Sequence, residues 1–312
     1  MTSAPPLVVL AGATATGKTG LSIRLAEWLI AQGRPAEIVS ADSRQVFRGL
    51  DIGTAKVSRP DRARVPHHGL DLVDPDSPFS VAEYATNVRA ALAGIAERGG
   101  VALLVGGTGL YLRTIGRGIA TEALPSDAAV RARIEAELVS DGLPALAARL
   151  QAVAPTLAAP IDLRNPRRVV RTLEIAELRG DRPLPVPEGY PGPIVWLGLR
   201  AATGIHAKWI ADRARAQFEN GLIDEARALR ERYDPTLPAF SAIGYREAWE
   251  LIDGSRTLDE AIELDTSRNV AFAKRQRTWF RAEPDITWLD VGEAEEPDAR
   301  AGAVVTRLLA GG

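Results

Sequence analysis

A glycine-rich loop near the start of the sequence constrains the fold more than any other feature. Residues 12–19 read Gly-Ala-Thr-Ala-Thr-Gly-Lys-Thr, which fits the pattern of a glycine, four residues, a second glycine, a lysine and a serine or threonine. The apolar run Leu7–Ala11 precedes this loop. Leu21, Leu25 and Leu29 follow it at helical spacing. The segment therefore predicts a buried strand, a phosphate-binding loop and a helix, in that order.

The residue types of this loop suit the binding of phosphate. Its glycines let backbone amides turn toward phosphate oxygens, and the positive end of the following helix points at the same place. Lys18 supplies a cationic charge, and the Thr19 hydroxyl can hold a magnesium ion. The ligand is either a nucleotide or another diphosphate. We predict that the phosphate-binding residues are Gly12, Ala13, Thr14, Ala15, Thr16, Gly17, Lys18 and Thr19.

Further apolar runs end in small or polar residues. Ile38–Ala41 ends at Asp42, and Val101–Val105 ends in Gly-Gly-Thr-Gly after a helix-like stretch over residues 81–98. Ile194–Leu199 is another apolar run of strand length. Alternating strands and helices predict an α/β fold, with a P-loop NTPase-like parallel sheet flanked by helices. Ligands of such sheets gather at the carboxyl ends of the strands.

The middle of the chain has a different composition. Alanine-rich and arginine-rich segments at residues 130–138, 143–150 and 165–178 are typical of helices, and the proline-rich stretch 181–193 is typical of a loop. We therefore predict a first part of the core at residues 1–120, a helical insertion domain at residues 121–193, and a core continuation with C-terminal helices at residues 194–312. The tail after Glu283 is acidic and rich in glycine and alanine, and it points to no chemistry.

The composition excludes several classes of protein. The 38 basic and 40 acidic side chains give a net charge of −2, which excludes a histone-like protein that neutralises many phosphates. The absence of cysteine excludes a disulfide framework, a thiolate zinc site and a cysteine nucleophile. No apolar run approaches the ~20 residues that span a bilayer, and the first residues lack the pattern of a signal peptide. We expect a cytoplasmic protein without membrane association.

Asp42 is the only acid placed directly at the end of a well-formed predicted strand. An ATPase of the common type carries a magnesium-binding acid beside its phosphate loop, but the strand ending at Val105 leads into glycines. Asp42 can therefore act as a metal ligand or as a general base. The polar stretch over residues 43–56 is too long for a tight turn, and its Arg and Gln side chains can contact bases or phosphates. It is a candidate substrate loop.

This loop and the phosphate loop together resemble the tRNA dimethylallyltransferase family, also called tRNA isopentenyltransferases or IPP transferases. Since cysteine is absent, the chain lacks the zinc-finger extension of eukaryotic relatives and resembles the bacterial type. The matching segments run in order from residue 12 to about residue 281. They include Val65-Pro-His-His68, Asp74-Pro75, Phe79-Ser-Val-Ala82, Gly106-Gly-Thr-Gly-Leu-Tyr-Leu112, Asn165-Pro-Arg-Arg168, Ala242-Ile-Gly-Tyr245 and Lys274-Arg-Gln276.

The resemblance implies an enzyme that transfers a dimethylallyl group from dimethylallyl diphosphate to tRNA. The acceptor is the N6 amine of the adenosine 3′ of the anticodon (tRNA position 37), in tRNAs that read codons beginning with U. Asp42 would then accept the proton of the amine. Lys18, Thr19 and a Mg²⁺ ion on Thr19 would stabilise the diphosphate that leaves. Arg213, in a helix that matches an arginine-bearing helix of the family, would add charge at the diphosphate.

The resemblance also implies that the protein grips the anticodon loop of tRNA while the target base is extruded. Residues 267–281 carry five basic side chains and no acid, which gives this segment a local charge of +5. We expect Trp279 and Phe280, near the end of the segment, to lie in the core. We expect a monomer. A P-loop kinase that uses ATP on a small molecule or nucleoside, and a non-enzymatic P-loop RNA-binding protein, remain alternatives. The candidate tRNA contacts are Asp42, Ser43, Arg44, Gln45, Thr108, Arg131, Arg167, Arg168 and Arg171.

Overall fold

The chain divides into two compact units. A computed structural model describes residues 4–292 and 297–311, and it separates a core, which comprises residues up to 118 and from 189 onward, from an inserted unit at residues 119–188. The segment from Gly189 to Pro193, which the sequence assigns to the insertion, belongs to the core. There the Gly189 amide donates to Arg117 O at 3.1 Å, and the Tyr190 hydroxyl donates to Pro5 O at 2.7 Å.

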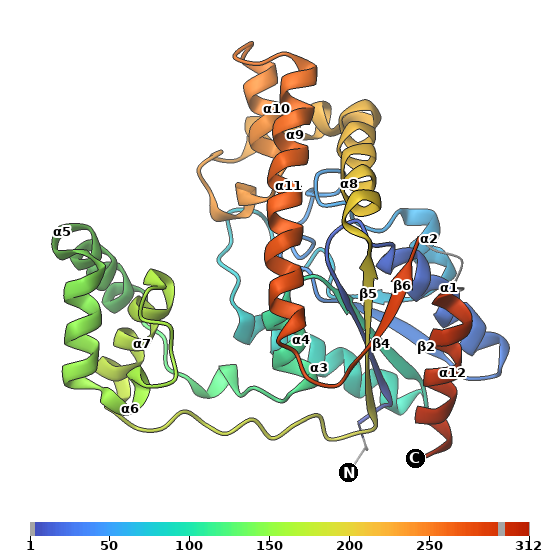
Figure 1. The fold of residues 1–312 in the computed structure, drawn as a ribbon, viewed down its shortest axis with the longest axis horizontal. Helices are drawn as coiled ribbons and strands as arrows, with labels where there is room; N and C mark the ends of the chain where they lie inside the picture. Colours follow the sequence, from blue (N-terminus) through green and yellow to red (C-terminus); the bar gives the residue numbers. More distant parts are fainter. Residues whose placement is uncertain (1–3, 293–296, 312) are drawn as a thin grey trace. The chain divides into compact units, whose positions relative to one another are not determined.

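A parallel sheet forms the centre of the core unit (Figure 1). Within the described residues it has six strands in the order β3-β2-β4-β1-β5-β6, and every pair is parallel. The central strands are continuous apolar runs because helices cover both faces of the sheet. This confirms the predicted α/β fold. The strands are β1 (Leu7–Gly12), β2 (Ala36–Ser40), β3 (His67–His68), β4 (Val101–Gly106), β5 (Ile194–Ala201) and β6 (Ile286–Val291).

The alternation of side chains along β1 divides the core between the two faces of the sheet. Val8 and Leu10 pack with residues of α1 (Lys18–Ala31) and α12 (Pro297–Ala310), which lie side by side in Figure 1. Leu7 and Val9 pack on the other face with residues of α3 (Val81–Glu97), α4 (Gly109–Gly116) and α11 (Leu258–Arg281). The tail after Glu283 therefore completes the core, since it supplies β6 and α12.

Side chains near the helix ends explain where two long helices begin. Ser80 precedes α3, where its hydroxyl accepts from the Glu83 amide while the Glu83 carboxylate accepts from the Ser80 amide. Thr257 and Glu260 form the same reciprocal pair at the start of α11. A short helix, α2 (Arg59–Arg64), begins after the similar cap of Ser58.

The C-terminal helices form a group beyond the carboxyl ends of the strands (Figure 1). The first of the predicted C-terminal helices is interrupted at Asn220 and Gly221, because Gly221 has a φ of +106° that ends the helix. A five-residue π-turn, residues 218–222, spans this interruption, and a short 3₁₀ turn follows at residues 238–241. The helices of this group are α8 (Thr203–Gln217), α9 (Ile223–Arg232), α10 (Tyr245–Ile252) and α11.

The inserted unit has its own apolar core. Its helices are α5 (Ala128–Val153), α6 (Pro155–Ala158) and α7 (Pro166–Arg179), preceded by a 3₁₀ turn at residues 121–123. Two of the predicted helices are the halves of α5, which is kinked at Gly142 with a φ of +81°. The core side chains include Ile134, Leu146, Leu150, Val169 and Leu173.

None of the helices in residues 4–292 and 297–311 combines the length and the apolar character that a membrane crossing requires.

Candidate functional site

A cavity of about 250 Å³ lies at the carboxyl ends of β1, β2 and β4 in the core unit. It brings together the phosphate loop, the loop after β2, the turn after β4 and one arginine of α8. Among the residues that the structure describes, Asp42 is the only carboxylate in its lining. The lining residues are Thr14, Ala15, Thr16, Gly17, Lys18, Thr19, Ser40, Asp42, Gln45, Thr54, Ala55, Val105, Gly106, Gly107 and Arg213.

The phosphate loop adopts left-handed backbone conformations that expose its amides. Ala15 has a φ of +58° and Gly17 a φ of +84°, and α1 begins at Lys18 with no side-chain hydrogen bond at its N-cap. The first amides of α1 are therefore free to bind an anion. Gly12, the last residue of β1, and Ala13 lie behind this lining, where Ala13 O accepts from Thr16 Oγ1 at 2.8 Å and from Lys18 Nζ at 2.7 Å.

The electrostatics of the cavity favour a bound anion. The pKa of Lys18 is lowered to about 8, chiefly because the side chain is buried; the nearby Asp42 raises this pKa and the nearby Arg213 lowers it. Burial also lowers the pKa of Arg213. Two cationic side chains therefore share a cavity with one carboxylate, and a diphosphate group would relieve their mutual repulsion.

Two buried side chains from the C-terminal helices hold the phosphate loop in place. Gln276 of α11 accepts from the Thr14 amide at 2.8 Å and donates to Gly107 O at 2.9 Å, so that it ties β1's loop to β4's turn. His206 of α8 lies 2.7 Å from Thr14 O, and burial lowers the pKa of its imidazole, which leaves a neutral ring that donates through Nε2. No pattern in the sequence indicates the His206 contact, whereas Gln276 lies in a segment that matches the family.

Asp42 is fixed at the end of β2 by the backbone that follows it. Its Oδ1 accepts from the Arg44 amide at 2.8 Å and from the Gln45 amide at 3.4 Å. Thr108 Oγ1 accepts from the Ser43 amide at 3.0 Å, and the Thr108 amide donates to Ala41 O at 3.1 Å. Ser43 and Thr108 therefore lie beside the lining of the cavity and orient the chain around Asp42.

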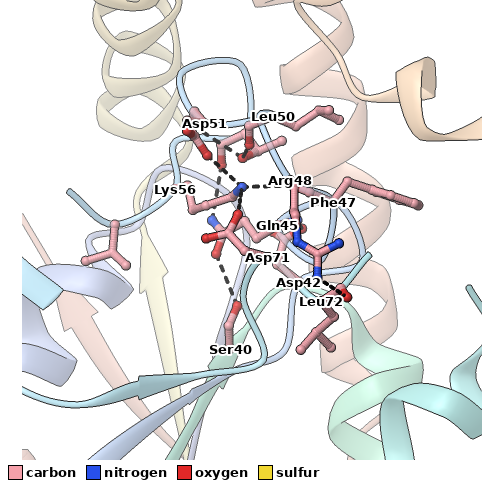
Figure 2. A network of polar contacts seen from close by, with 12 residues as sticks. Ser40, Asp42, Gln45, Phe47, Arg48, Leu50, Asp51, Lys56, Asp71 and Leu72 are labelled. Carbon is pink, nitrogen blue, oxygen red and sulfur yellow. Dashed lines mark hydrogen bonds and ion pairs between the residues drawn. The ribbon is translucent and has the colours of Figure 1, made fainter. Parts of the chain in front are cut away.

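The rest of the candidate substrate loop is a closed structure rather than an open basic surface (Figure 2). Lys56, with a side chain only 1% exposed, donates to Asp51 and Asp71 at 2.7 Å and to Phe47 O at 2.8 Å. Gln45 accepts from Ser40 Oγ at 3.1 Å and donates to Thr54 O at 3.1 Å. Lys56 and Gln45 thus fold the loop on itself, and Arg44 Nη1 donates to Pro238 O at 2.8 Å.

A carboxylate of α9 anchors the far end of this loop. Glu225 accepts from the amides of Ile52 at 2.8 Å and Gly53 at 3.1 Å, and also from the Tyr245 hydroxyl at 2.7 Å. A Cβ atom on Gly53 would lie 2.5 Å from the Tyr245 ring, so only glycine permits this approach. The loop is therefore attached to the C-terminal helices as well as to the sheet.

The candidate arginines of the inserted unit fall into two groups. Arg131 and Arg171 bind Glu174, whose side chain is fully buried, at 2.9 and 2.8 Å. Burial raises the pKa of Glu174, but the hydrogen bonds from the two arginines outweigh it and leave the pKa below its ordinary value. Arg167 and Arg168 instead lie exposed in the first turn of α7.

The expectation for the aromatic pair at the end of α11 is confirmed for Phe280, whereas Trp279 is only partly buried. Phe280 is 2% exposed and belongs to the main core cluster. Trp279 packs against that cluster, where Arg113 lies 4.8 Å above its ring. A Cβ atom on Gly109 would lie 2.0 Å from Trp279 Nε1, so this glycine is required by the indole.

Comparisons with known proteins agree with one another. The IPP transferase family model matches residues 45–283. The tRNA dimethylallyltransferase of a Roseiflexus species is 42% identical over 310 residues, which cover 97% of this chain and 99% of the relative. That of Thiobacillus denitrificans is 41% identical over 317 residues, with 98% and 97% covered. The crystal structure of a tRNA isopentenylpyrophosphate transferase from Bacillus halodurans superposes with a TM-score of 0.71, at 36% identity and with 97% and 96% of the chains covered.

Proposed function

This chain belongs to the IPP transferase family, and on that basis we propose that it is an enzyme that transfers a dimethylallyl group to tRNA. The donor is dimethylallyl diphosphate, and the acceptor is the N6 amine of the adenosine 3′ of the anticodon in tRNAs that read codons beginning with U. The products are N6-(dimethylallyl)adenosine in tRNA and diphosphate. One observation supports this chemistry best: the cavity combines an anion-binding loop with a single carboxylate.

The phosphate loop and two cations bind the diphosphate of the donor. Lys18 and Arg213 line the cavity with the amides of the loop, and these groups stabilise the negative charge that develops as the allylic carbon–oxygen bond breaks. No phosphoryl group is transferred in this reaction, so no residue is needed to orient a water molecule. The lack of a second acid at the end of β4 is consistent with that difference.

Asp42 is the general base of the proposal. The N6 amine attacks the allylic carbon, diphosphate leaves, and the amine proton passes to the Asp42 carboxylate. The hydrogen bonds of Oδ1 with the backbone fix the direction of the carboxylate without neutralising it. The carboxylate and the phosphate loop face one cavity, so donor and acceptor can meet there.

The residues of the cavity fit a magnesium ion that is held mainly by the substrate. The described part of the chain has no cluster of three or more side chains of the types that form an all-protein metal site. Thr19 nevertheless brings a hydroxyl oxygen to the cavity, and Mg²⁺ is commonly bound by few protein oxygens together with substrate phosphates and water. When bound, Mg²⁺ would add positive charge at the leaving diphosphate.

The anticodon loop of tRNA is the proposed macromolecular partner, and the cytoplasm is the proposed location of a monomer. Arg167 and Arg168 are exposed and suited to phosphate contacts, whereas Arg131 and Arg171 act on the shape of the inserted unit through Glu174. Ser43, Arg44, Gln45 and Thr108 act near the target adenosine. Of these, Gln45 and Thr108 act chiefly by shaping the loop.

Incubation with unmodified tRNA and dimethylallyl diphosphate tests the proposal. We expect a digested adenosine nucleoside to gain the mass of one dimethylallyl group, with release of one diphosphate. A parallel reaction with ATP is the control for a kinase. ATP turnover without prenyl addition would contradict the proposal and favour phosphoryl transfer, and binding of tRNA without either reaction would favour a non-enzymatic RNA-binding protein.

A further inference from the structure

Arg213 depends on other residues for its place at the cavity. It is partly buried, and its Nε is buried without a hydrogen-bond partner among the described residues. Its Nη2 donates to Asn269 Oδ1 of α11 at 3.2 Å. A guanidinium with one acceptor and an open donor edge can turn toward any nearby anion. Asp42 is the competing anion, because it lines the same cavity as Arg213 and, after Asp265, also attracts the Arg213 charge.

The orientation of the Asn269 amide is set from its other end. Asn269 Nδ2 donates to Asp265 Oδ1 at 2.8 Å and to Asp265 O at 3.2 Å, one turn earlier in α11. Because both acceptors of Asp265 require the NH₂ group, the Oδ1 of Asn269 must face Arg213. An arginine has only donors, so this is the one amide orientation that can hold it.

The surroundings of Asp265 keep its carboxylate in place. Asp265 is 1% exposed, and a Cβ atom on Gly244 would lie 3.2 Å from its Oδ2. Gly244 has a φ of +109° and its amide donates to Glu247 at 2.9 Å. The pKa of Asp265 is raised to about 6, because burial and the nearby Glu247 raise it more than Asn269, Arg213 and Arg268 lower it. The Asp265 carboxylate attracts the Arg213 guanidinium from the side of α11.

We propose that Asn269 and Asp265 are positioning residues, which hold the Arg213 guanidinium toward the diphosphate and away from Asp42. Neither residue lines the cavity, and both act through Arg213. The inference rests on the proposed function, since it assigns Arg213 to the leaving diphosphate. Its consequence is specific: the loss of Asn269 weakens the binding of diphosphate and leaves the binding of tRNA intact.

The test measures the binding of inorganic diphosphate by calorimetry, with the full chain and Mg²⁺. We expect Asn269→Leu to raise the Kd about tenfold, because a hydrogen bond to a charged group is lost. Asp265→Asn keeps an acceptor for Asn269 but removes the charge, and we expect a rise of about threefold. The tRNA Kd stays within about twofold of the wild type in both. Equal diphosphate affinity in these variants and the wild type would overturn the proposal.

A matched control exists in another helix. Asn87 of α3 donates to Glu83 O, just as Asn269 donates to the carbonyl oxygen four residues before it. Unlike Asn269, Asn87 is exposed to solvent. Asn87→Leu should leave the diphosphate Kd unchanged. If Asn269→Leu does not fold, Asp265→Asn is compared with the wild type in its place, and the same equality of Kd overturns the proposal.

A double-mutant cycle separates positioning from general distortion. In an Arg213→Met background, Asn269→Leu should have no further effect on diphosphate binding, because the residue that it positions is gone. A tenfold loss in both backgrounds would overturn the proposal. Failure of the proposed function has a different signature, since the wild type would then bind diphosphate normally and add no prenyl group to tRNA.

Discussion

The phosphate-loop cavity and the inserted unit both contain basic side chains, but those of the cavity face a space for a ligand, whereas two of those in the inserted unit form ion pairs within the protein. In the cavity, Lys18 and Arg213 face a space whose lining has one carboxylate. In the inserted unit, Arg131 and Arg171 converge on the buried Glu174, and the Arg131 contact joins α5 to α7. The position of the counter-charge, rather than the number of arginines, separates a ligand-binding site from a structural one.

The largest expected effect lies in the cavity. Asp42→Asn keeps the shape of the side chain but removes the proton acceptor, so the single-turnover rate should fall about 10³-fold. The Kd for tRNA should stay within about twofold of the wild type. Rapid-quench measurement of prenylated tRNA at saturating substrates gives this rate, and an unchanged rate would remove Asp42 from the role of base.

Lys18 provides a pH test of the same region. Because its pKa is lowered to about 8, the side chain is protonated below that pH and loses its charge as the pH rises through it. The affinity for inorganic diphosphate should therefore fall between pH 7 and pH 9. Lys18→Arg keeps its charge throughout this range, and the ionisation of diphosphate is common to both proteins. The difference between the two titrations isolates Lys18, and parallel titrations would contradict the expectation.

Removal of the counter-charge tests the structural role of the inserted unit. Glu174→Leu leaves two arginines without their buried partner, and we expect a loss of about 3 kcal/mol in the free energy of unfolding. Chemical denaturation followed by circular dichroism measures it. Glu188→Leu, a change at an exposed glutamate near the end of the same unit, is the control and should have little effect. Equal stability of the two variants would argue against a structural role for the arginine cluster.

The smallest expected effect comes from the exposed arginines of α7. Arg168→Ala should weaken tRNA binding about threefold and reduce the salt dependence by about one charge, with no change in thermal stability. Arg131→Ala should show the opposite pattern, with lower stability and a nearly unchanged salt dependence. Filter binding at several salt concentrations separates the two, and identical behaviour of both variants would remove the distinction between the regions.

The residues that the sequence predicts well are those whose neighbours in the chain determine their surroundings. The phosphate loop and Asp42 follow short apolar strands, so their place at one edge of the sheet follows from the parallel fold. His206, Gln276 and Asn269 contact residues of the cavity lining only because helices packed on the core bring them there from far along the chain. No local pattern reports such long-range packing.

The assignment of the arginines shows the same limit. Arg171 has its partner Glu174 three residues later, which a reading of the helix face can detect. Arg131 reaches the same carboxylate from 43 residues away, and only the packing of α5 on α7 reveals that contact. A charge pattern in the sequence therefore identifies basic residues without telling which are already satisfied.

The loop after Asp42 has its shape before any substrate arrives. Glu225 binds backbone amides at its far end, and Lys56 and Gln45 close its middle. The conformational entropy of this segment is thus lost when the protein folds. Substrate binding therefore carries little further entropic cost for ordering the loop. Hydrogen exchange at Ile52 and Gly53 should be slow in the free protein and change little when tRNA binds. The segment is therefore a rigid part of the substrate-binding site, and the anticodon loop of tRNA has to change its own conformation to fit it.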